Sequence, residues 1–113
     1  MNISKEEFEK IVYQKLESLP KFFLEKLENI EIFVEEKPFS QNVLGLYQGV
    51  PFPHRKNPGY SFVMPDKIIL YKKIIERGCR NKKDIEEKIE TVLFHELGHY
   101  LGLNEYQLRK MNL

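Results

Sequence analysis

The chain has 113 residues, of which 42% are hydrophobic and 31% are charged, so it has the size and composition of a single compact globular domain covering residues 1–113. Eighteen Lys and Arg residues against seventeen Asp and Glu residues leave a formal net charge of +1. This balance gives no electrostatic basis for binding to nucleic acid or to an anionic membrane, and we expect neither as a partner.

The N-terminal segment, residues 1–7, lacks the basic and then apolar stretch of a secretory signal. No apolar run approaches the roughly 18 residues that a membrane span needs. The single cysteine, Cys79, cannot form an internal disulfide, which agrees with a reducing compartment. We therefore expect a cytoplasmic protein in which Cys79 is a buried or bystander thiol, with a role as ligand or nucleophile as the alternative.

Two helices are predicted at the start of the chain. Ser4 followed by Glu7 is a capping-box pattern, and the apolar residues after it recur at helical spacing, which predicts a helix from about Lys5 to Ser18. Pro20 is well placed to open a second short helix ending near Asn29, because the N–H that proline lacks is not used in the first helical turn.

Three extended segments follow. Residues 30–35 alternate between apolar and other residues, which predicts a strand with one buried face. Residues 43–49 carry a central glycine, Gly45, that suggests a bulge or a close backbone approach. Residues 67–71 are short, apolar and β-branched, as in a strand.

The connection Val50–Asp66 is long, contains four prolines and carries the basic group His54-Arg55-Lys56. Connections of this length without structure of their own are uncommon and are usually functional or disordered. A substrate-facing flap and a plain mobile loop are both open interpretations of this segment.

A long helix is predicted near the C-terminus, after one helical turn that ends at Gly78. Asn81 with Asp84 is an N-terminal capping pattern, and apolar residues continue at helical spacing to Gly102, a residue suited to a left-handed helix end. Within this helix we expect Gly98 to mark close packing against a strand.

Asn104 with Gln107 suggests one more short helix. The order of these elements predicts an α+β fold: a small mixed sheet from about Ile30 to Tyr71 packs against the long helix of Asn81–Leu101, with N-terminal helices and a short C-terminal helix beside it.

The long helix carries the residues with the clearest chemistry, His95-Glu96-Leu97-Gly98-His99. On a helix that advances about 100° per residue, His95 and His99 lie on one face, about 6 Å of rise apart, so that both imidazoles can bind one metal ion. Zinc accepts such nitrogen ligands. Glu96 points to a flanking direction and can reach a water molecule without occupying a coordination position.

A third ligand is expected after the second histidine. The fourteen residues that follow His99 contain no His, Cys or Asp and one glutamate, Glu105. Gly102 would let the chain turn back so that Glu105 faces the metal. His54 from the long connection is the alternative ligand.

This arrangement predicts a zinc-dependent metallopeptidase. Three protein ligands leave one position for water, zinc lowers the pKa of that water, and Glu96 can act as its general base and later protonate the leaving amine. Tyr100 and Tyr106 flank the motif and could donate a hydrogen bond to an oxyanion, but we expect both to pack in the core.

Five segments are also similar to a known family, the small bacterial minimal-zincin metallopeptidase-like proteins, over nearly the whole chain: Ser4–Phe8, Leu19–Pro20, Leu44–Pro51, Pro65–Tyr71 and His95–Gly102. The resemblance implies the zincin sheet-and-helix fold. It also implies that His95, His99 and the acidic residue after the glycine, here Glu105, are the metal ligands, and that Glu96 is the motif glutamate. Family members often have Asp at the third position, where this chain has the longer Glu.

A peptide or protein substrate is the expected partner, bound as an added strand along the sheet edge. Only fourteen residues follow His99, which is enough to build one side of a cleft. Two alternatives therefore stay open: a metal-binding module without peptidase turnover, and a subunit whose partner completes the cleft. The oligomeric state is not predicted.

Overall fold

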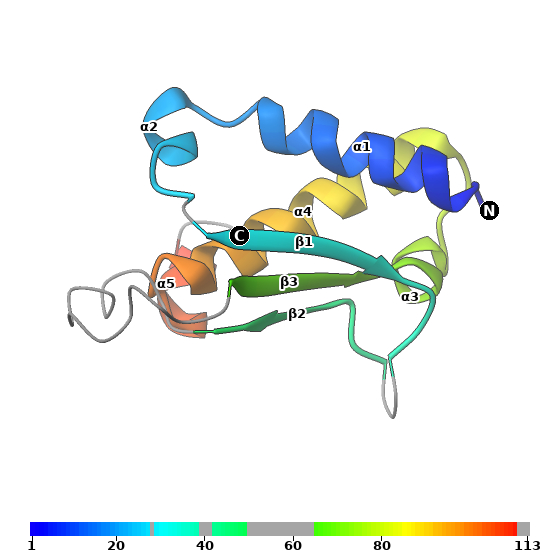
Figure 1. Cartoon of the computed structure of the whole chain (residues 1–113). Helices are drawn as coiled ribbons and strands as arrows, with labels where there is room; N and C mark the ends of the chain where they lie inside the picture. The colour runs from blue at the N-terminus through cyan, green and yellow to red at the C-terminus, as the bar shows by residue number, and fades with distance from the viewer. Residues whose placement is uncertain (28, 39–41, 50–64, 111–113) are drawn as a thin grey trace.

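The computed structural model describes residues 1–27, 29–38, 42–49 and 65–110. Eight elements follow one another along these residues: α1 (Lys5–Glu17), α2 (Lys21–Leu24), β1 (Ile30–Glu35), β2 (Gly45–Gln48), β3 (Asp66–Tyr71), α3 (Lys72–Glu76), α4 (Lys82–Tyr100) and α5 (Glu105–Lys110). Figure 1 shows the three strands side by side, with α4 running across one face of the sheet and α1 beside it. The predicted α+β fold, with a small mixed sheet against a long helix, is confirmed.

The sheet has the strand order β1-β3-β2. β1 runs parallel to β3, with Ile32 opposite Ile68, and β2 runs antiparallel to β3, with Tyr47 opposite the same Ile68. β1 and β2 are therefore the two edge strands among the described residues. Both β2 and β3 contact α4, so the sheet edge formed by β2 lies beside the helix that carries the histidines.

The hydrophobic core lies between the sheet, α1 and α4. β1 turns Val34 into this core and leaves Phe33 on the other face largely exposed, as its alternating sequence predicts. Six fully buried members of the core come from α1, β3 and α4: Phe8, Ile68, Leu70, Ile85, Ile89 and Leu93. Burial of these side chains fixes the position of α4 against the sheet.

The two long helices begin at their predicted caps. The Ser4 hydroxyl accepts a hydrogen bond from the Glu7 N–H at 3.1 Å, and the Asn81 side-chain oxygen accepts one from the Asp84 N–H at 2.9 Å. Each cap satisfies an N–H group that has no partner inside its helix. The helix predicted over residues 5–18 ends one residue earlier than expected, at Glu17.

The second helix is much shorter than predicted, because α2 ends at Leu24 and does not reach Asn29. Asn29 has a positive φ of 52°, a left-handed conformation that asparagine tolerates better than most residues. Its carbonyl accepts a hydrogen bond from the Asp66 N–H at 2.9 Å. Asn29 therefore belongs to the start of the sheet rather than to the end of the helix.

Gly45 lets β2 approach α4 closely, as its position in the second strand suggested. A Cβ atom at this residue would lie 2.9 Å from Val92 Cγ1 and 3.3 Å from Glu96 Cγ. Any larger side chain would push the edge strand away from the helix. The glycine thus sets the width of the space beside Glu96.

Gly98 also marks a close contact, but the predicted partner is wrong. A Cβ atom at Gly98 would overlap the side chain of Leu108, which is fully buried and belongs to α5 rather than to a strand. The glycine is needed because the C-terminal helix, and not the sheet, packs on this face of α4. Gly98 and Leu108 therefore determine how α5 is seated.

Several expectations concern residues outside the described part of the chain, above all His54 and almost all of the Val50–Asp66 connection. Cys79 is described: its thiol is buried and donates to the Ile75 carbonyl at 3.3 Å, as a structural cysteine would. Among the described residues, no helix is both long and apolar enough to cross a membrane.

Replacing Gly98 by alanine should lower the free energy of unfolding of the metal-free protein. Overpacking against Leu108 costs about 1–3 kcal/mol, whereas alanine is favoured over glycine in a helix interior by about 1 kcal/mol. Urea unfolding measures the net change in the free energy of unfolding. In a Leu108→Ala background the new methyl group has room, and the same substitution should be neutral or stabilising there. An equal loss in both backgrounds would contradict the proposed contact.

Candidate metal and catalytic site

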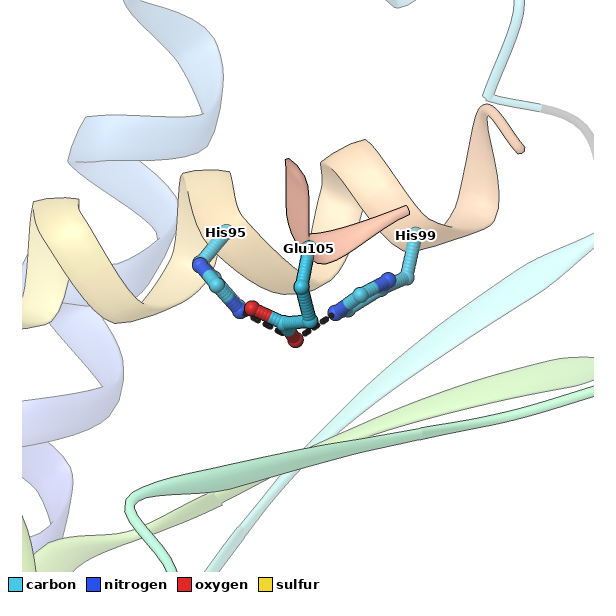
Figure 2. A group of neighbouring side chains, drawn as sticks. All are labelled: His95, His99 and Glu105. Atoms are coloured by element: carbon cyan, nitrogen blue, oxygen red, sulfur yellow. Dashed lines mark hydrogen bonds and ion pairs between the residues drawn. The ribbon is translucent and has the colours of Figure 1, made fainter. Parts of the chain in front are cut away.

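Three side chains from α4 and α5 point toward one another (Figure 2). Glu105 Oε1 lies 3.2 Å from His95 Nε2 and 2.9 Å from His99 Nε2. One ligand atom from each residue lies within 4.8 Å of the others. The structure thus brings together the three residues that the sequence singled out as ligands, whereas the alternative ligand, His54, lies outside the described residues.

Glu105 reaches the histidines because of the turn that ends α4. Gly102 has a φ of 89°, and its N–H donates to the His99 carbonyl at 2.9 Å. The next N–H, of Leu103, donates to the Gly98 carbonyl, also at 2.9 Å. This pair of bonds is a Schellman motif, which satisfies the last helix carbonyls and reverses the chain. Glycine is favoured at its left-handed position because it has no Cβ.

A capping box then starts α5 at once. The Asn104 side chain accepts the Gln107 N–H at 2.9 Å, and the Gln107 side chain accepts the Asn104 N–H at 2.8 Å. Glu105 is the first residue of this helix, and Leu108 one turn later is buried against Gly98. The cap and the buried leucine together fix the backbone from which Glu105 extends.

The turn also orients His99. Its Nδ1 atom lies 3.0 Å from the Leu103 carbonyl, and because a carbonyl can only accept, Nδ1 carries the proton. Nε2 is then the nitrogen that faces Glu105 and His95. A carbonyl that fixes the tautomer in this way is the usual support behind a metal-binding histidine.

The donor set fits a metal ion. Two imidazole nitrogens and one carboxylate oxygen form the ligand set of many catalytic zinc sites, which keep a fourth position for water. All three side chains are reachable from solvent, Glu105 more than either histidine. Hydrogen bonds from His95 and then His99 hold the pKa of Glu105 below its usual value, so that the group stays in the ionised form that binds metal.

Glu96 lies beside this cluster and is not one of its members. It is only 8% exposed, and its carboxylate accepts a hydrogen bond from the backbone N–H of Tyr47. Burial raises the pKa of Glu96, against smaller opposing effects of His99 and His95. A carboxylate with a raised pKa is a better proton acceptor, as a general base requires.

Two open hollows meet at Glu96, between β2 and the C-terminal half of α4. One, of about 430 Å³, is lined by Leu46, Tyr47, Glu96, His99, Gly102, Leu103 and Asn104. The other, of about 350 Å³, is lined by Leu44, Gly45, Thr91, Val92, His95, Glu96 and Glu105. Together they form a groove that passes the metal-binding cluster.

Of the two tyrosines that flank the motif, one packs as predicted and the other does not. Tyr100 is fully buried and its hydroxyl donates to the Lys26 carbonyl at 3.0 Å, so it packs in the core as predicted. Tyr106 is 66% exposed and lies under the Lys110 ammonium group, so the expectation of core packing is wrong. Tyr47, which the sequence assigned only to the sheet, lines the groove and contacts Glu96.

In the metal-free protein, Glu96→Gln should raise the melting temperature at neutral pH, because it removes a buried charge and keeps an acceptor for Tyr47. The pKa of Glu96 is raised in the folded state, so the ionised group destabilises the fold above that pKa. As the pH falls through the folded pKa to the unfolded value, the destabilisation disappears and the two proteins should converge.

Thermal unfolding in chelator at several pH values tests this prediction. Glu87→Gln, at an exposed glutamate of the same helix, is the matched control for the loss of one charge. A Glu96→Gln protein no more stable than the wild type at neutral pH would contradict the description of Glu96 as a buried charge.

Comparison with known proteins identifies the family of this chain. A profile of zincin-like metallopeptidases matches residues 27–113, a segment that contains the whole sheet, α4 and α5. A solved structure, a conserved hypothetical protein from Thermus thermophilus, is similar at 26% identity over 88% of this chain and 94% of that chain, with a TM-score of 0.59. A search of curated proteins finds no match. The resemblance noted in the sequence is thus confirmed, and the chain belongs to the zincin-like metallopeptidase family.

Proposed function

We propose that this protein is a zinc-dependent metallopeptidase in which His95, His99 and Glu105 hold the metal and Glu96 is the general base. The observation that carries the proposal is the convergence of the three donors on one point, beside a buried carboxylate that lines an open groove. Membership of the zincin-like family supports a hydrolase of this class.

The metal would be held by both helices at once. His95 and His99 offer Nε2 atoms from α4, and Glu105 offers a carboxylate from α5. The extra methylene of Glu, compared with Asp, is accommodated, since Glu105 Oε1 already lies beside both nitrogens. When bound, zinc supplies a Lewis acid that polarises the substrate carbonyl and lowers the pKa of a water molecule.

Glu96 would move the protons of the reaction. Its carboxylate takes a proton from the attacking water, and the same group delivers that proton to the nitrogen of the leaving amine. Burial raises the pKa of Glu96, and this favours the protonated carboxyl group that Glu96 becomes after it has taken the proton from water. The Tyr47 N–H orients the carboxylate from the β2 side.

The substrate would be an extended segment of peptide or protein lying along β2. The Leu44 carbonyl accepts from the Tyr71 N–H at 3.0 Å, and in an antiparallel ladder every second residue turns its backbone groups away from the partner strand. Gly45 and Tyr47 therefore turn theirs toward the groove. Since the Tyr47 N–H already donates to Glu96, an added peptide strand can pair with the other outward backbone groups of this edge, and the hollows can receive its side chains.

A second candidate function is a metal-binding module without turnover. It is favoured by the small size of α5, whose buried contact with α4 rests on Leu108 and which a metal would tie to the histidines. A related possibility is a subunit whose partner adds the second wall of the groove. The metal-binding module does not require Glu96 to be an acid or a base, whereas the subunit keeps Glu96 as its base and needs the partner to bind substrate.

Hydrolysis of a library of extended peptides by zinc-loaded protein tests the proposal, with zinc content measured in every sample. Glu96→Gln should reduce kcat/KM by about 100- to 10,000-fold, the usual contribution of a general base, while zinc stoichiometry stays unchanged. His95→Ala and Glu105→Ala are the controls that should lose zinc and activity together. Zinc-loaded wild-type protein that cleaves no peptide would remove the support for an enzyme that acts alone, and would leave the metal-binding module or the subunit whose partner completes the groove.

A further inference from the structure

Asp66 and Tyr47 form a partly buried hydrogen bond next to the groove. Asp66 is the first residue of β3 and is only 4% exposed. Its Oδ2 atom accepts the Tyr47 hydroxyl proton at 2.6 Å, a short bond of the kind that a carboxylate acceptor makes. Because this hydroxyl already donates its proton to Asp66, that proton is not available to a substrate. The tyrosine must therefore act in another way.

The neighbouring glycine makes room for this bond. The pairing of β2 with β3, continued by one residue, sets Gly49 opposite Asp66. A Cβ atom at Gly49 would overlap the Asp66 carboxylate, and its φ of 151° is in the range that favours glycine. The carboxylate thus reaches across to the tyrosine through the space that the missing side chain leaves.

Tyr47 connects three parts of the site. Its hydroxyl is bonded to Asp66 of β3, its ring meets the ring of Tyr100 of α4 edge-on at a centroid distance of 6.1 Å, and its backbone N–H donates to Glu96. The Tyr47 ring is therefore held at both its tip and its edge.

No other side chain of β2 can anchor this strand against α4. Residues 45 and 47 are the two positions of this four-residue strand that face α4, and Gly45 has no side chain. The strand lies at the sheet edge and is paired with β3 on one side. Its distance from α4 therefore depends on where the Tyr47 side chain is anchored.

We propose that Tyr47 and Asp66 are positioning residues, whose hydrogen bond holds β2 against α4 so that the Tyr47 N–H orients the carboxylate of Glu96. This inference rests on the proposed peptidase function for its effect on the rate. Its structural part, the link from the Asp66 carboxylate to the backbone amide at residue 47, can be measured without any activity.

Tyr47→Phe removes the hydroxyl and keeps the ring. Tyr100→Phe is the matched control, since it also removes a hydroxyl bond from a packed tyrosine but leaves the bond to Asp66 intact. After correction for global stability, hydrogen exchange of the residue 47 amide should be about tenfold faster in Tyr47→Phe and unchanged in Tyr100→Phe. Asp66→Asn, which keeps an acceptor oxygen, should lie closer to the wild type than Asp66→Ala.

Steady-state kinetics distinguish a positioning role of Tyr47 from a purely structural role. In zinc-loaded Tyr47→Phe, kcat should fall by about tenfold, as for a misplaced catalytic group, while KM and zinc affinity change by less than about twofold. A wild-type exchange rate of the residue 47 amide in Tyr47→Phe would overturn the inference. If the wild-type protein is an active enzyme, faster exchange in Tyr47→Phe with an unchanged kcat would overturn it as well. If Tyr47→Phe does not fold, the Asp66→Asn and Asp66→Ala pair decides on the same readouts.

An inert wild-type protein would be informative in a different way. Faster exchange at residue 47 in Tyr47→Phe would then support the link from Asp66 to the strand, while the proposed peptidase function would fail. The positioning role of Tyr47 and Asp66 and the proposed peptidase function can thus be rejected independently of each other.

Discussion

Where α4 ends, one turn determines the geometry of everything around the histidines. Gly102 adopts the left-handed conformation that closes the helix, and the reversed chain brings Glu105 back to His95 and His99. The same turn supplies the Leu103 carbonyl that orients the second histidine. A site of three donors is thereby built within one segment of eleven residues, 95–105, which suits a chain of this size.

The groove depends on a second close approach, between β2 and α4. Gly45 allows the edge strand to reach the helix, and Tyr47 joins the strand to Glu96 on one side and to Asp66 on the other. A larger peptidase can hold its base and its substrate strand between two lobes. In this chain, the glycine at position 45 lets the edge strand approach the helix directly, which needs little mass.

How much of the site could be predicted depends on how far apart in the sequence the interacting residues lie. Local signals were sufficient for α4 and for the placement of His95 and His99, because helical spacing and caps are read within a few residues. Glu105 was found because no other acidic residue follows the second histidine. The packing partner of Gly98 and the role of Tyr47 could not be found, because they depend on which helix covers a face and which strand lies at the edge.

The central claim is that Glu105 completes a metal site with the two histidines and leaves one position open. A crystal structure of the protein soaked in zinc, with the metal located by anomalous scattering, tests it most directly. The account predicts zinc at about 2.0–2.2 Å from His95 Nε2, His99 Nε2 and a Glu105 carboxylate oxygen, with water in the fourth position. Zinc held by a different third residue such as His54, or a closed site with four protein ligands, would contradict it.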